Sequence, residues 1–349
     1  MGEFILKRMT GFEKGVNLAG WFSQWDEINK EHIESFIRDE DLERIAEWGC
    51  DHVRIPIDHS ILVDKNGNFK DSGFEYVRQA IERCRSKNLN VVIDLNKVDG
   101  FAFDLDEIHR SFFDSIILQE KFYELWERIA QKFGKYSQNV AFELLSDITD
   151  AKYSSVWNNI IRHSILRIRY YSPSTMIIFG GCKYNSCTTV GELPNISDRN
   201  IAYTFHFNAP LLFTHQGAHW MPVMPLDFRY SYEHTYGEYM AKTQEIFGTN
   251  TGFNGHSYDP DMILGEEYFE NRIEEAIKIA AERNKYLYCG EYGVIKNAKA
   301  EEALKWYKAV NSVFAKHNIG RAAWCYKGMD FGISDEEYAP VVGELVRYL

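Results

Sequence analysis

The sequence lacks the features of two large protein classes. No apolar run approaches the roughly 20 residues that a membrane-spanning helix needs, and the mean hydropathy is -0.37. Basic residues are few, since 39 Lys and Arg face 51 Asp and Glu and give a formal net charge of -12. A surface that tracks nucleic-acid phosphates needs a basic balance. The sequence therefore predicts a protein that neither spans a membrane nor binds nucleic acid.

Cysteine is also scarce and scattered. The chain has six cysteines and no CxxC pair: Cys50, Cys84, Cys182, Cys187, Cys289 and Cys325. This spacing favours neither a disulfide scaffold nor a zinc site. We also predict no cofactor.

The first residues, MGEFILKRMTG, contain no long apolar stretch and no small-residue cleavage site of the kind that ends a secretory leader. We expect a cytoplasmic protein, or a secreted one whose leader is not part of this sequence. No linker, repeat or low-complexity tract divides the 349 residues. We therefore predict one domain over residues 1–349. We also expect a monomer.

Short β-branched runs alternate with long amphipathic segments, which is typical of βα units and a parallel sheet. Apolar residues recur at helical spacing on four of these segments, for example Phe74, Val77, Ile81 and Cys84. The predicted strands cover residues 15–18, 52–57, 90–95, 140–145, 176–179, 201–207, 285–291 and 321–326. Eight such units predict a (β/α)8 TIM barrel.

One connection is much longer than a normal loop. Residues 209–266, between the sixth strand and a helix predicted at 267–283, are rich in Tyr, His, Gly and Pro. Long insertions on the loop face of a barrel are usually lids or cleft walls. We therefore predict an insertion or lid subdomain here and expect Trp220, together with His215 and His219, to contact the substrate.

The active site of a barrel lies at the carboxyl ends of its strands. Those positions carry polar or aromatic groups that would meet in one pocket: Arg54, Asn96, Ser146, Asp147, His206, Glu291 and Trp324. Asp147 and Glu291 form the carboxylate pair that glycoside hydrolysis requires. We expect Arg54 to lower the pKa of Glu291 by charge pairing and Trp324 to form the floor of a sugar site.

Six strings in the sequence resemble glycoside hydrolase family 5, in family order and over nearly the whole chain. They are GVNLAGWFSQW (15–25), HVRIPID (52–58), AFELLSDITD (141–150), YTFHFNAPLLFTHQGAHW (203–220), YCGEYGV (288–294) and AAWCYKGMDF (322–331). They are most similar to the compact single-domain endoglucanases of the endoglucanase C type. The resemblance implies a retaining barrel enzyme that acts on β-glucans and related oligosaccharides or polysaccharides without a metal.

Four positions match the family's site residues. Glu291 matches the nucleophile, Arg54 the arginine that supports it, His206 the histidine of the sixth strand and Trp324 the platform tryptophan. Other positions depart from the family pattern. Ser146-Asp147 replace Asn-Glu, whose Glu is the acid/base. Asn96 and Lys97 replace histidines, and Asn208 replaces a tyrosine.

Aspartate at position 147 has a side chain about 1.5 Å shorter than glutamate, and misplacing a catalytic group by ~1 Å costs on the order of a hundredfold in rate. Left uncompensated, the site would be weak. A longer carboxylate gap would instead admit a water and favour inversion, whereas a backbone shift would restore the retaining gap. The sequence leaves these outcomes open.

The changes at Ser146, Asn208 and Asn96 preserve polarity. We therefore interpret the pocket as one whose side chains have changed to accept another substrate. Our hypothesis is a retaining β-glycoside hydrolase acting on a β-glucan-like or non-standard β-glycoside, with Glu291 as nucleophile and Asp147 as acid/base. The alternative is a catalytically silent glycan-binding protein on the same barrel.

Each of these residues also has a purely structural interpretation. Asp147 would cap a helix, and His206 or Trp324 would be ordinary core. Lys97 would be solvated or paired with Asp94 or Asp99. Glu143, inside the fourth strand, is expected to be structural.

Overall fold

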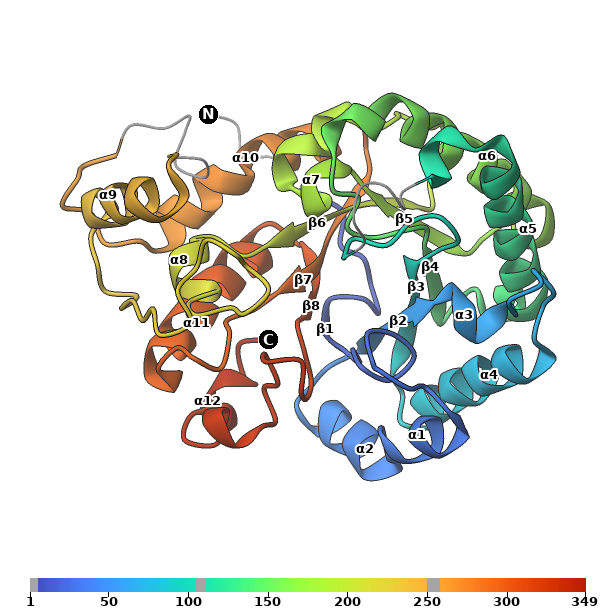
Figure 1. The fold of residues 1–349 in the computed structure, drawn as a ribbon, viewed down its shortest axis with the longest axis horizontal. Coiled ribbons are helices and arrows are strands. Elements are labelled where there is room, and N and C mark those ends of the chain that lie inside the picture. Colours follow the sequence, from blue (N-terminus) through green and yellow to red (C-terminus); the bar gives the residue numbers. More distant parts are fainter. Residues whose placement is uncertain (1–5, 105–110, 250–257) are drawn as a thin grey trace.

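The computed structural model describes residues 6–104, 111–249 and 258–349, in which eight parallel strands form a closed barrel inside a ring of helices (Figure 1). Each strand pairs with the next one in the sequence, and the last pairs with the first. The strands are β1 Lys14–Asn17, β2 His52–Asp58, β3 Asn90–Lys97, β4 Val140–Glu143, β5 Met176–Gly180, β6 Ile201–Phe207, β7 Tyr286–Tyr292 and β8 Gly320–Ala323. The predicted (β/α)8 fold is confirmed.

The long helices pack their apolar stripes on the barrel. They are α2 Asp39–Glu47, α4 Asp71–Ser86, α5 Ile116–Phe133, α6 Ser154–Tyr171, α10 Glu266–Glu282 and α11 Ala300–Lys316. The predicted stripe of α4 is buried at all four positions, as are the stripes predicted on α5, α10 and α11. Burial of an apolar side chain contributes about 1.5–3 kcal/mol, so these stripes hold the ring in place.

Shorter helices lie in the connections. They are α1 Lys30–Ser35, α3 His59–Leu62, α7 Cys182–Asn185, α8 Leu211–Thr214, α9 Tyr236–Phe247 and α12 Val342–Leu345, with 3-10 turns η2 Phe112–Asp114, η3 Gly134–Tyr136, η4 Ala151–Tyr153, η5 Cys187–Glu192 and η6 Glu336–Tyr338. All six cysteines are buried free thiols. Among the described residues, no helix has both the length and the apolar character needed to cross a membrane.

The barrel interior has an apolar layer below a polar one. The apolar layer is a separate buried cluster of residues Met9, Phe12, Val92, Ala141, Ile178, Ala202, Tyr288 and Ala322. Because side chains alternate along a strand, the next inward positions towards the carboxyl ends belong to Asp94 and Glu143. Both are fully buried, as is Arg54 on β2. Buried charges are stable only when they are paired, so this layer needs the ion pairs described below.

The β6–β7 ladder is irregular where it reaches the polar layer. Phe205 pairs with Cys289 but His206 pairs with Glu291, so Gly290 is an extra residue on β7. A Cβ atom at Gly290 would lie 3.0 Å from Oγ1 of Thr204 and 3.3 Å from Nε2 of His206. Such a bulge redirects neighbouring side chains, and here it needs glycine to leave space for the histidine ring.

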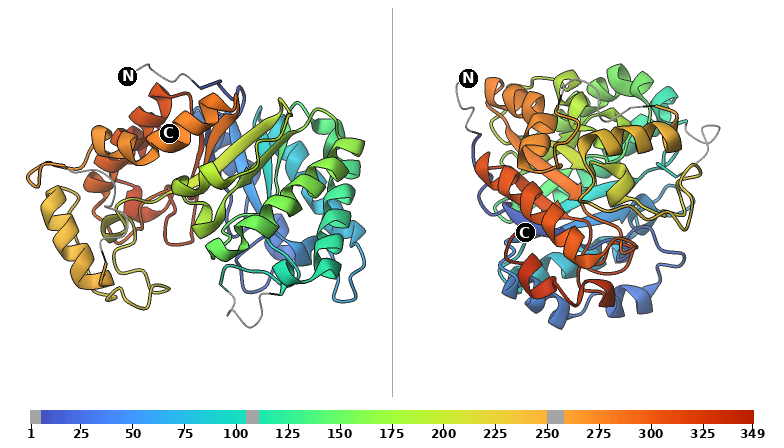
Figure 2. Two further views of the ribbon diagram at one scale, coloured as in Figure 1. Left: turned by 90° about the horizontal axis from the view of Figure 1, so that it is seen from above. Right: turned by 90° about the vertical axis from the view of Figure 1, so that its left-hand side faces the viewer.

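The long connection after β6 carries α8 and α9, which lie at one side of the barrel near α10 and α11 (Figures 1 and 2). Tyr232, Tyr236 and Tyr239 of this segment are buried, whereas Trp220 is 45% exposed. Residues 250–257 of the predicted insertion lie outside the described residues. A lid role for residues 209–266 stays a prediction.

Candidate active site

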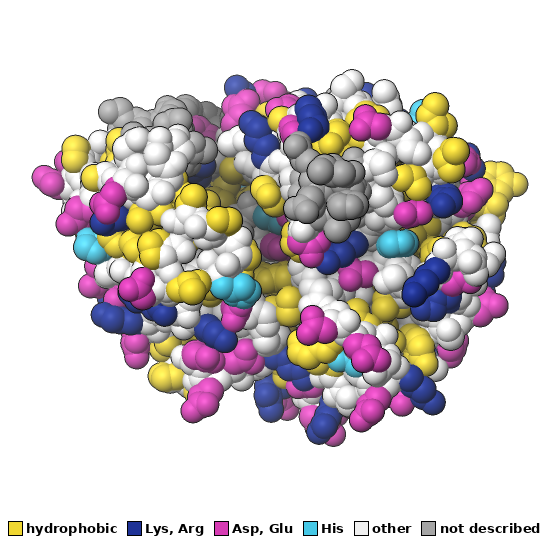
Figure 3. Space-filling model, in the orientation of Figure 1, with side chains coloured by type: hydrophobic (Ala, Val, Ile, Leu, Met, Phe, Trp, Pro, Cys, Tyr) yellow, Lys and Arg dark blue, Asp and Glu magenta, His cyan; other side chains and the backbone are white. Residues whose placement is uncertain are grey.

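A cavity of about 1020 Å³ opens among the loops at the carboxyl ends of the strands (Figure 3). Segments far apart in the sequence contribute to its wall, including the loops after β4, β5 and β8 and the connection that holds α8 and α9. Six of the nine predicted site residues line it: Asp147, His206, Asn208, Trp220, Glu291 and Trp324. The topology therefore brings the two predicted catalytic carboxylates to one place.

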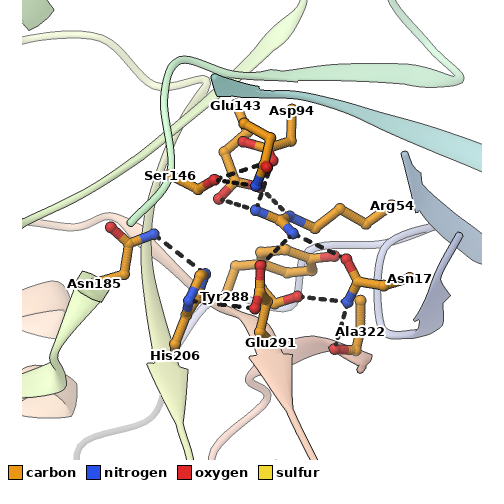
Figure 4. Close-up of polar contacts among 12 residues, drawn as sticks. Asn17, Arg54, Asp94, Glu143, Ser146, Asn185, His206, Tyr288, Glu291 and Ala322 are labelled. Carbon is orange, nitrogen blue, oxygen red and sulfur yellow. Dashed lines mark hydrogen bonds and ion pairs between the residues drawn. The ribbon is translucent and has the colours of Figure 1, made fainter. Parts of the chain in front are cut away.

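Arg54 lies deeper than predicted. It is the third residue of β2 rather than a strand end, and its long side chain runs through the polar layer with no solvent exposure. Its Nε donates to Oε2 of Glu143 at 2.7 Å, and Nη2 lies 3.0 Å from Oδ2 of Asp94. Its Nη1 donates to Oε1 of Glu291 at 2.8 Å and to Oδ1 of Asn17 at 2.9 Å (Figure 4). One guanidinium thus joins four strands.

Sharing Arg54 among three carboxylates has consequences for their protonation. Burial raises the pKa of Asp94 well above its ordinary value, although Arg54 opposes this shift. Burial also raises the pKa of Glu291, and the charges of His206 and Arg54 do not compensate for it. Arg54 lowers the pKa of Glu291 as predicted, but desolvation is the larger effect, so the net shift of this pKa is upward.

His206 is paired with Asp147. Its Nδ1 lies 3.0 Å from Oδ1 of Asp147 and 3.7 Å from Oε2 of Glu291. Burial alone would lower the pKa of His206, but the two carboxylates raise it to about 9. Burial would likewise raise the pKa of Asp147, but the charge and hydrogen bond of His206 lower it. The substrate-free site therefore holds an imidazolium–carboxylate pair at neutral pH.

Asp147 does not cap a helix. It follows β4 in a left-handed backbone conformation with φ 56°, which aspartate tolerates better than most residues. The cap of η4 is Asp150, whose side chain accepts a hydrogen bond from the backbone N–H of Lys152, and α6 begins only at Ser154. The helix-cap interpretation is wrong because the chain runs on for several residues before any helix starts.

Asp147, His206 and Glu291 each offer one ligand atom within 4.8 Å of the other two. A cation site would need Nδ1 of His206 without its proton. The 3.0 Å contact with Asp147 and the pKa of about 9 keep that proton on the ring. In this structure a proton therefore occupies the Nδ1 position that a cation would need.

Ser146 and Asn96 lie beneath the cavity rather than in its wall. Ser146 Oγ donates to Oδ2 of Asp94 at 3.1 Å, and Asn96 Nδ2 donates to Ser146 Oγ at 3.3 Å. Their exposed fractions are 0% and 1%. Contact of Ser146, Asn96 and Arg54 with a substrate stays a prediction; in this structure these residues hold the carboxylates from below.

Lys97 has a different partner from either one predicted. Its Nζ lies 2.7 Å from Oδ2 of Asp104, while Asp99 pairs with Lys121. Asp94 is fully buried, and its Oδ2 lies 3.0 Å from Nη2 of Arg54. This geometry directs Asp94 into the barrel and to Arg54.

Two tryptophans border the cavity. Trp324 follows β8 and is only partly buried, so its interpretation as ordinary core is wrong. Trp220 lies at the mouth with His215 and His219, and its ring makes edge contacts with both imidazoles. Flat, exposed rings of this kind suit the apolar faces of sugars.

Three residues of the site were missed or undervalued from the sequence. Asn17, at the end of β1, donates to the carbonyl oxygens of Gly290 and Ala322 and accepts from Arg54. Asp94 shares the guanidinium of Arg54, and Asn185 contacts His206. For Asn17 and Asp94 the available signal was a polar residue on a strand in an otherwise apolar run.

Comparisons with known proteins agree with this geometry. The family model described as "Cellulase (glycosyl hydrolase family 5)" matches residues 11–330. The chain belongs to glycoside hydrolase family 5. This family 5 protein is 39% identical to cellodextrinase A of Ruminococcus flavefaciens over 90% of this chain and 85% of that one. It is 34% identical to endoglucanase C of Acetivibrio thermocellus over 98% of each chain. It is a glycoside hydrolase, and the resemblance seen in the sequence is confirmed.

Solved structures extend the likeness of fold. The endoglucanase Cel5A of Thermotoga maritima superposes with a TM-score of 0.74 over 97% of both chains, at 22% identity. Its level of identity supports the barrel alone. The substrate and the roles of individual residues are therefore argued from the site itself.

Proposed function

We propose that this family 5 hydrolase is a retaining β-glycosidase in which Glu291 is the nucleophile and Asp147 the proton donor. The observation that carries the proposal is that one carboxylate oxygen of Asp147 lies within 4.8 Å of one of Glu291. Carboxyl groups are about 5–5.5 Å apart in retaining enzymes and about 6.5–9.5 Å apart in inverting ones. The short gap supports attack by the carboxylate over attack by an intervening water.

The left-handed backbone at Asp147 supports the view that the chain compensates for the shorter side chain. It brings Oδ1 to 3.0 Å from Nδ1 of His206. A donor must be protonated when it acts, and this contact provides the route. Movement of the proton from Nδ1 to Oδ1 makes Asp147 a neutral acid and His206 a neutral imidazole.

The reaction then balances in two steps. In the first, Glu291 Oε2 forms a bond to the anomeric carbon, the bond from that carbon to the leaving oxygen breaks, and the leaving oxygen takes the proton of Asp147. In the second, Asp147 takes a proton from water, the water oxygen bonds to the anomeric carbon, and Glu291 departs with its electron pair. Arg54 stays on Oε1 throughout, leaving Oε2 free to react.

We further propose a substrate of the β-glucan-oligosaccharide class, or a β-glycoside related to it. The names cellodextrinase A and endoglucanase C among the relatives support this class. The partly exposed rings of Trp324 and Trp220 border the cavity as sugar-stacking surfaces. Withdrawal of Ser146 and Asn96 beneath the cavity supports tolerance of changes at the sugar's second carbon.

The proposal is tested with aryl β-glycosides, cello-oligosaccharides and mixed-linkage glucan. We expect turnover that releases the first sugar product in the β configuration. Proton NMR, recorded before the product mutarotates, measures this configuration. A first product in the α configuration would overturn retention. Calorimetric binding of these glycans without any turnover would instead identify a silent glycan-binding protein.

A further inference from the structure

Asn185 holds the face of His206 that points away from the catalytic carboxylates. Its side chain is fully buried and comes from the loop after β5. Nδ2 of Asn185 lies 3.2 Å from Nε2 of His206 (Figure 4). The other ring nitrogen, Nδ1, lies 3.0 Å from Oδ1 of Asp147. The imidazole is therefore held between side chains from two different loops.

The backbone that carries Asn185 is strained. Lys183, Tyr184 and Asn185 have φ values of 56°, 56° and 51° in succession, and each left-handed residue costs roughly 1–2 kcal/mol. Gly180 precedes this turn, and a Cβ atom there would lie 2.7 Å from Cγ of Asn185. Strain of this kind persists where the surrounding structure requires it, often at functional sites. Its effect here is to bring one amide to His206.

An amide has a property that suits this position. Its NH2 group donates to Nε2 of a neutral imidazole, and after a half-turn of the amide its oxygen accepts from Nε2–H of an imidazolium. Oδ1 of Asn185 is buried and has no hydrogen-bond partner among the described residues. The amide oxygen is therefore free to exchange places with the nitrogen when the histidine changes its charge.

The other groups that face His206 are charged. Asp147 follows β4, Glu291 lies on β7, and Arg54 reaches the cluster from β2. Asn185 is the uncharged hydrogen-bond partner of the ring among the contacts of the described residues. A partner without charge leaves the proton between His206 and Asp147 movable, because it does not fix the ring in the imidazolium form.

We propose that Asn185 is a positioning residue for hydrolysis. It partners Nε2 of His206 in both charge states and so keeps Nδ1 directed at Asp147 while the proton moves between them. This inference rests on the proposed function, in which Asp147 is the proton donor.

Three variants distinguish the effect of the Asn185 amide group from the effect of the left-handed backbone conformation. Asn185→Gly keeps a left-handed residue without strain and removes the amide, whereas Asn185→Ala removes the amide and adds strain. Asn185→Asp keeps the shape but supplies an acceptor with a negative charge. Asn284→Gly and Asn284→Ala are the matched controls, because Asn284 is an exposed asparagine with φ 54° outside the site.

The first measurement is an NMR titration of the His206 ring without substrate, with the resonance assigned by its loss in His206→Gln. We expect the pKa of His206 to fall in Asn185→Gly and Asn185→Ala, because the imidazolium loses the acceptor for Nε2–H. It should rise in Asn185→Asp, because a negative charge stabilises the imidazolium. A merely structural role would not move the value in opposite directions.

The second measurement is the pH profile of kcat on an aryl β-glycoside. Asn185→Gly and Asn185→Asp should each lower kcat by roughly tenfold to a hundredfold with little change in KM, and the alkaline limb should move with the pKa of His206. Unchanged titration and unchanged kcat in Asn185→Gly would overturn the inference. The titration needs no turnover, so it tests Asn185 even if the proposed hydrolysis fails.

Discussion

Nη1 of Arg54 lies 2.8 Å from Oε1 of Glu291, and the guanidinium that makes this contact is fully buried. The contact fixes one oxygen of the glutamate and leaves Oε2, which lies 3.7 Å from Nδ1 of His206, towards the cavity. In the proposed mechanism Glu291 is therefore oriented before substrate arrives, which lowers the entropic part of the barrier.

Replacing Glu291 by glutamine keeps its size but removes the attacking charge. We expect kcat on any substrate to fall by about a thousandfold or more, with the fold retained in circular dichroism. The exposed Glu274→Gln on α10 is the matched control and should leave kcat unchanged. Near wild-type turnover by Glu291→Gln would remove this residue from the mechanism.

Replacing Asp147 by asparagine should have an effect that depends on the leaving group. An aryl glycoside whose phenol has a low pKa needs little protonation, so it should lose much less kcat/KM than one whose phenol has a high pKa. Equal losses for both substrates would show that Asp147 is not the donor.

Asp147→Glu lengthens the side chain at position 147 by about 1.5 Å. We expect it to disturb the 3.0 Å contact with His206 and to lower kcat/KM by about tenfold or more. Adding Ser146→Asn tests whether the family's usual pair works in this pocket. A gain in activity on cellulosic substrates would mean that the short side chain is a handicap.

Arg54→Lys should strongly destabilise the fold. Lysine cannot reach Asp94, Glu143 and Glu291 together, and loss of a partner from a buried ion pair costs about 3–5 kcal/mol. Urea unfolding measures the change. Arg78→Lys, at an exposed pair with Glu75 and Glu82, is the control and should leave the free energy of unfolding nearly unchanged.

The His206–Asp147 pair predicts how stability depends on pH. The folded-state pKa of His206 is about 9 against an ordinary value of 6.5, so its contribution is complete below pH 6.5 and is lost as the pH rises through 9. The shift corresponds to about 3 kcal/mol. His206→Gln should flatten the fall in unfolding free energy over this range, and His163→Gln, at an exposed site, should not. If the unfolding free energy fell equally with pH in both variants, the proposed His206–Asp147 ion pair would be contradicted.

The pocket should tolerate changes at the second carbon of the sugar. Ser146 is fully buried beneath the cavity and is bonded to Asp94, so it does not offer the amide that a free 2-hydroxyl would engage. Aryl β-glycosides varied at C2 should therefore show kcat/KM values within about tenfold of the gluco compound. A hundredfold preference for unmodified cello-oligosaccharides would contradict the interpretation that the pocket is altered for another substrate.

The sequence predicted the barrel because each strand is a short apolar run followed by a helix with one apolar stripe. It predicted β4 and β8 to extend to residues 145 and 326, but these strands end at Glu143 and Ala323. Beyond these residues the chain leaves the ladder so that Asp147 can adopt its left-handed conformation and Trp324 can face the cavity. Propensity does not encode such departures, since Leu144 and Leu145 are good strand residues.

The pocket was predicted in outline because strand ends converge in any barrel. Its protonation was not predictable, because the pKa of Glu291 depends on how Arg54 is shared with Asp94 and Glu143. The sequence did not predict Asn185 as a site residue, because its contact with His206 depends on three successive residues in the left-handed conformation. No local rule assigns that conformation to a Lys-Tyr-Asn sequence.

The shared guanidinium of Arg54 also sets the electrostatic character of the cavity floor. The four carboxyl groups of Asp94, Glu143, Asp147 and Glu291 outnumber the two cationic side chains, Arg54 and His206, and movement of the proton between His206 and Asp147 leaves the net charge of that pair unchanged. An excess of negative charge favours positive charge at the anomeric centre, which develops in an oxocarbenium-like transition state. The floor is thus preorganised for that cation, and a protonated aza-sugar should bind more tightly than the neutral sugar of the same shape.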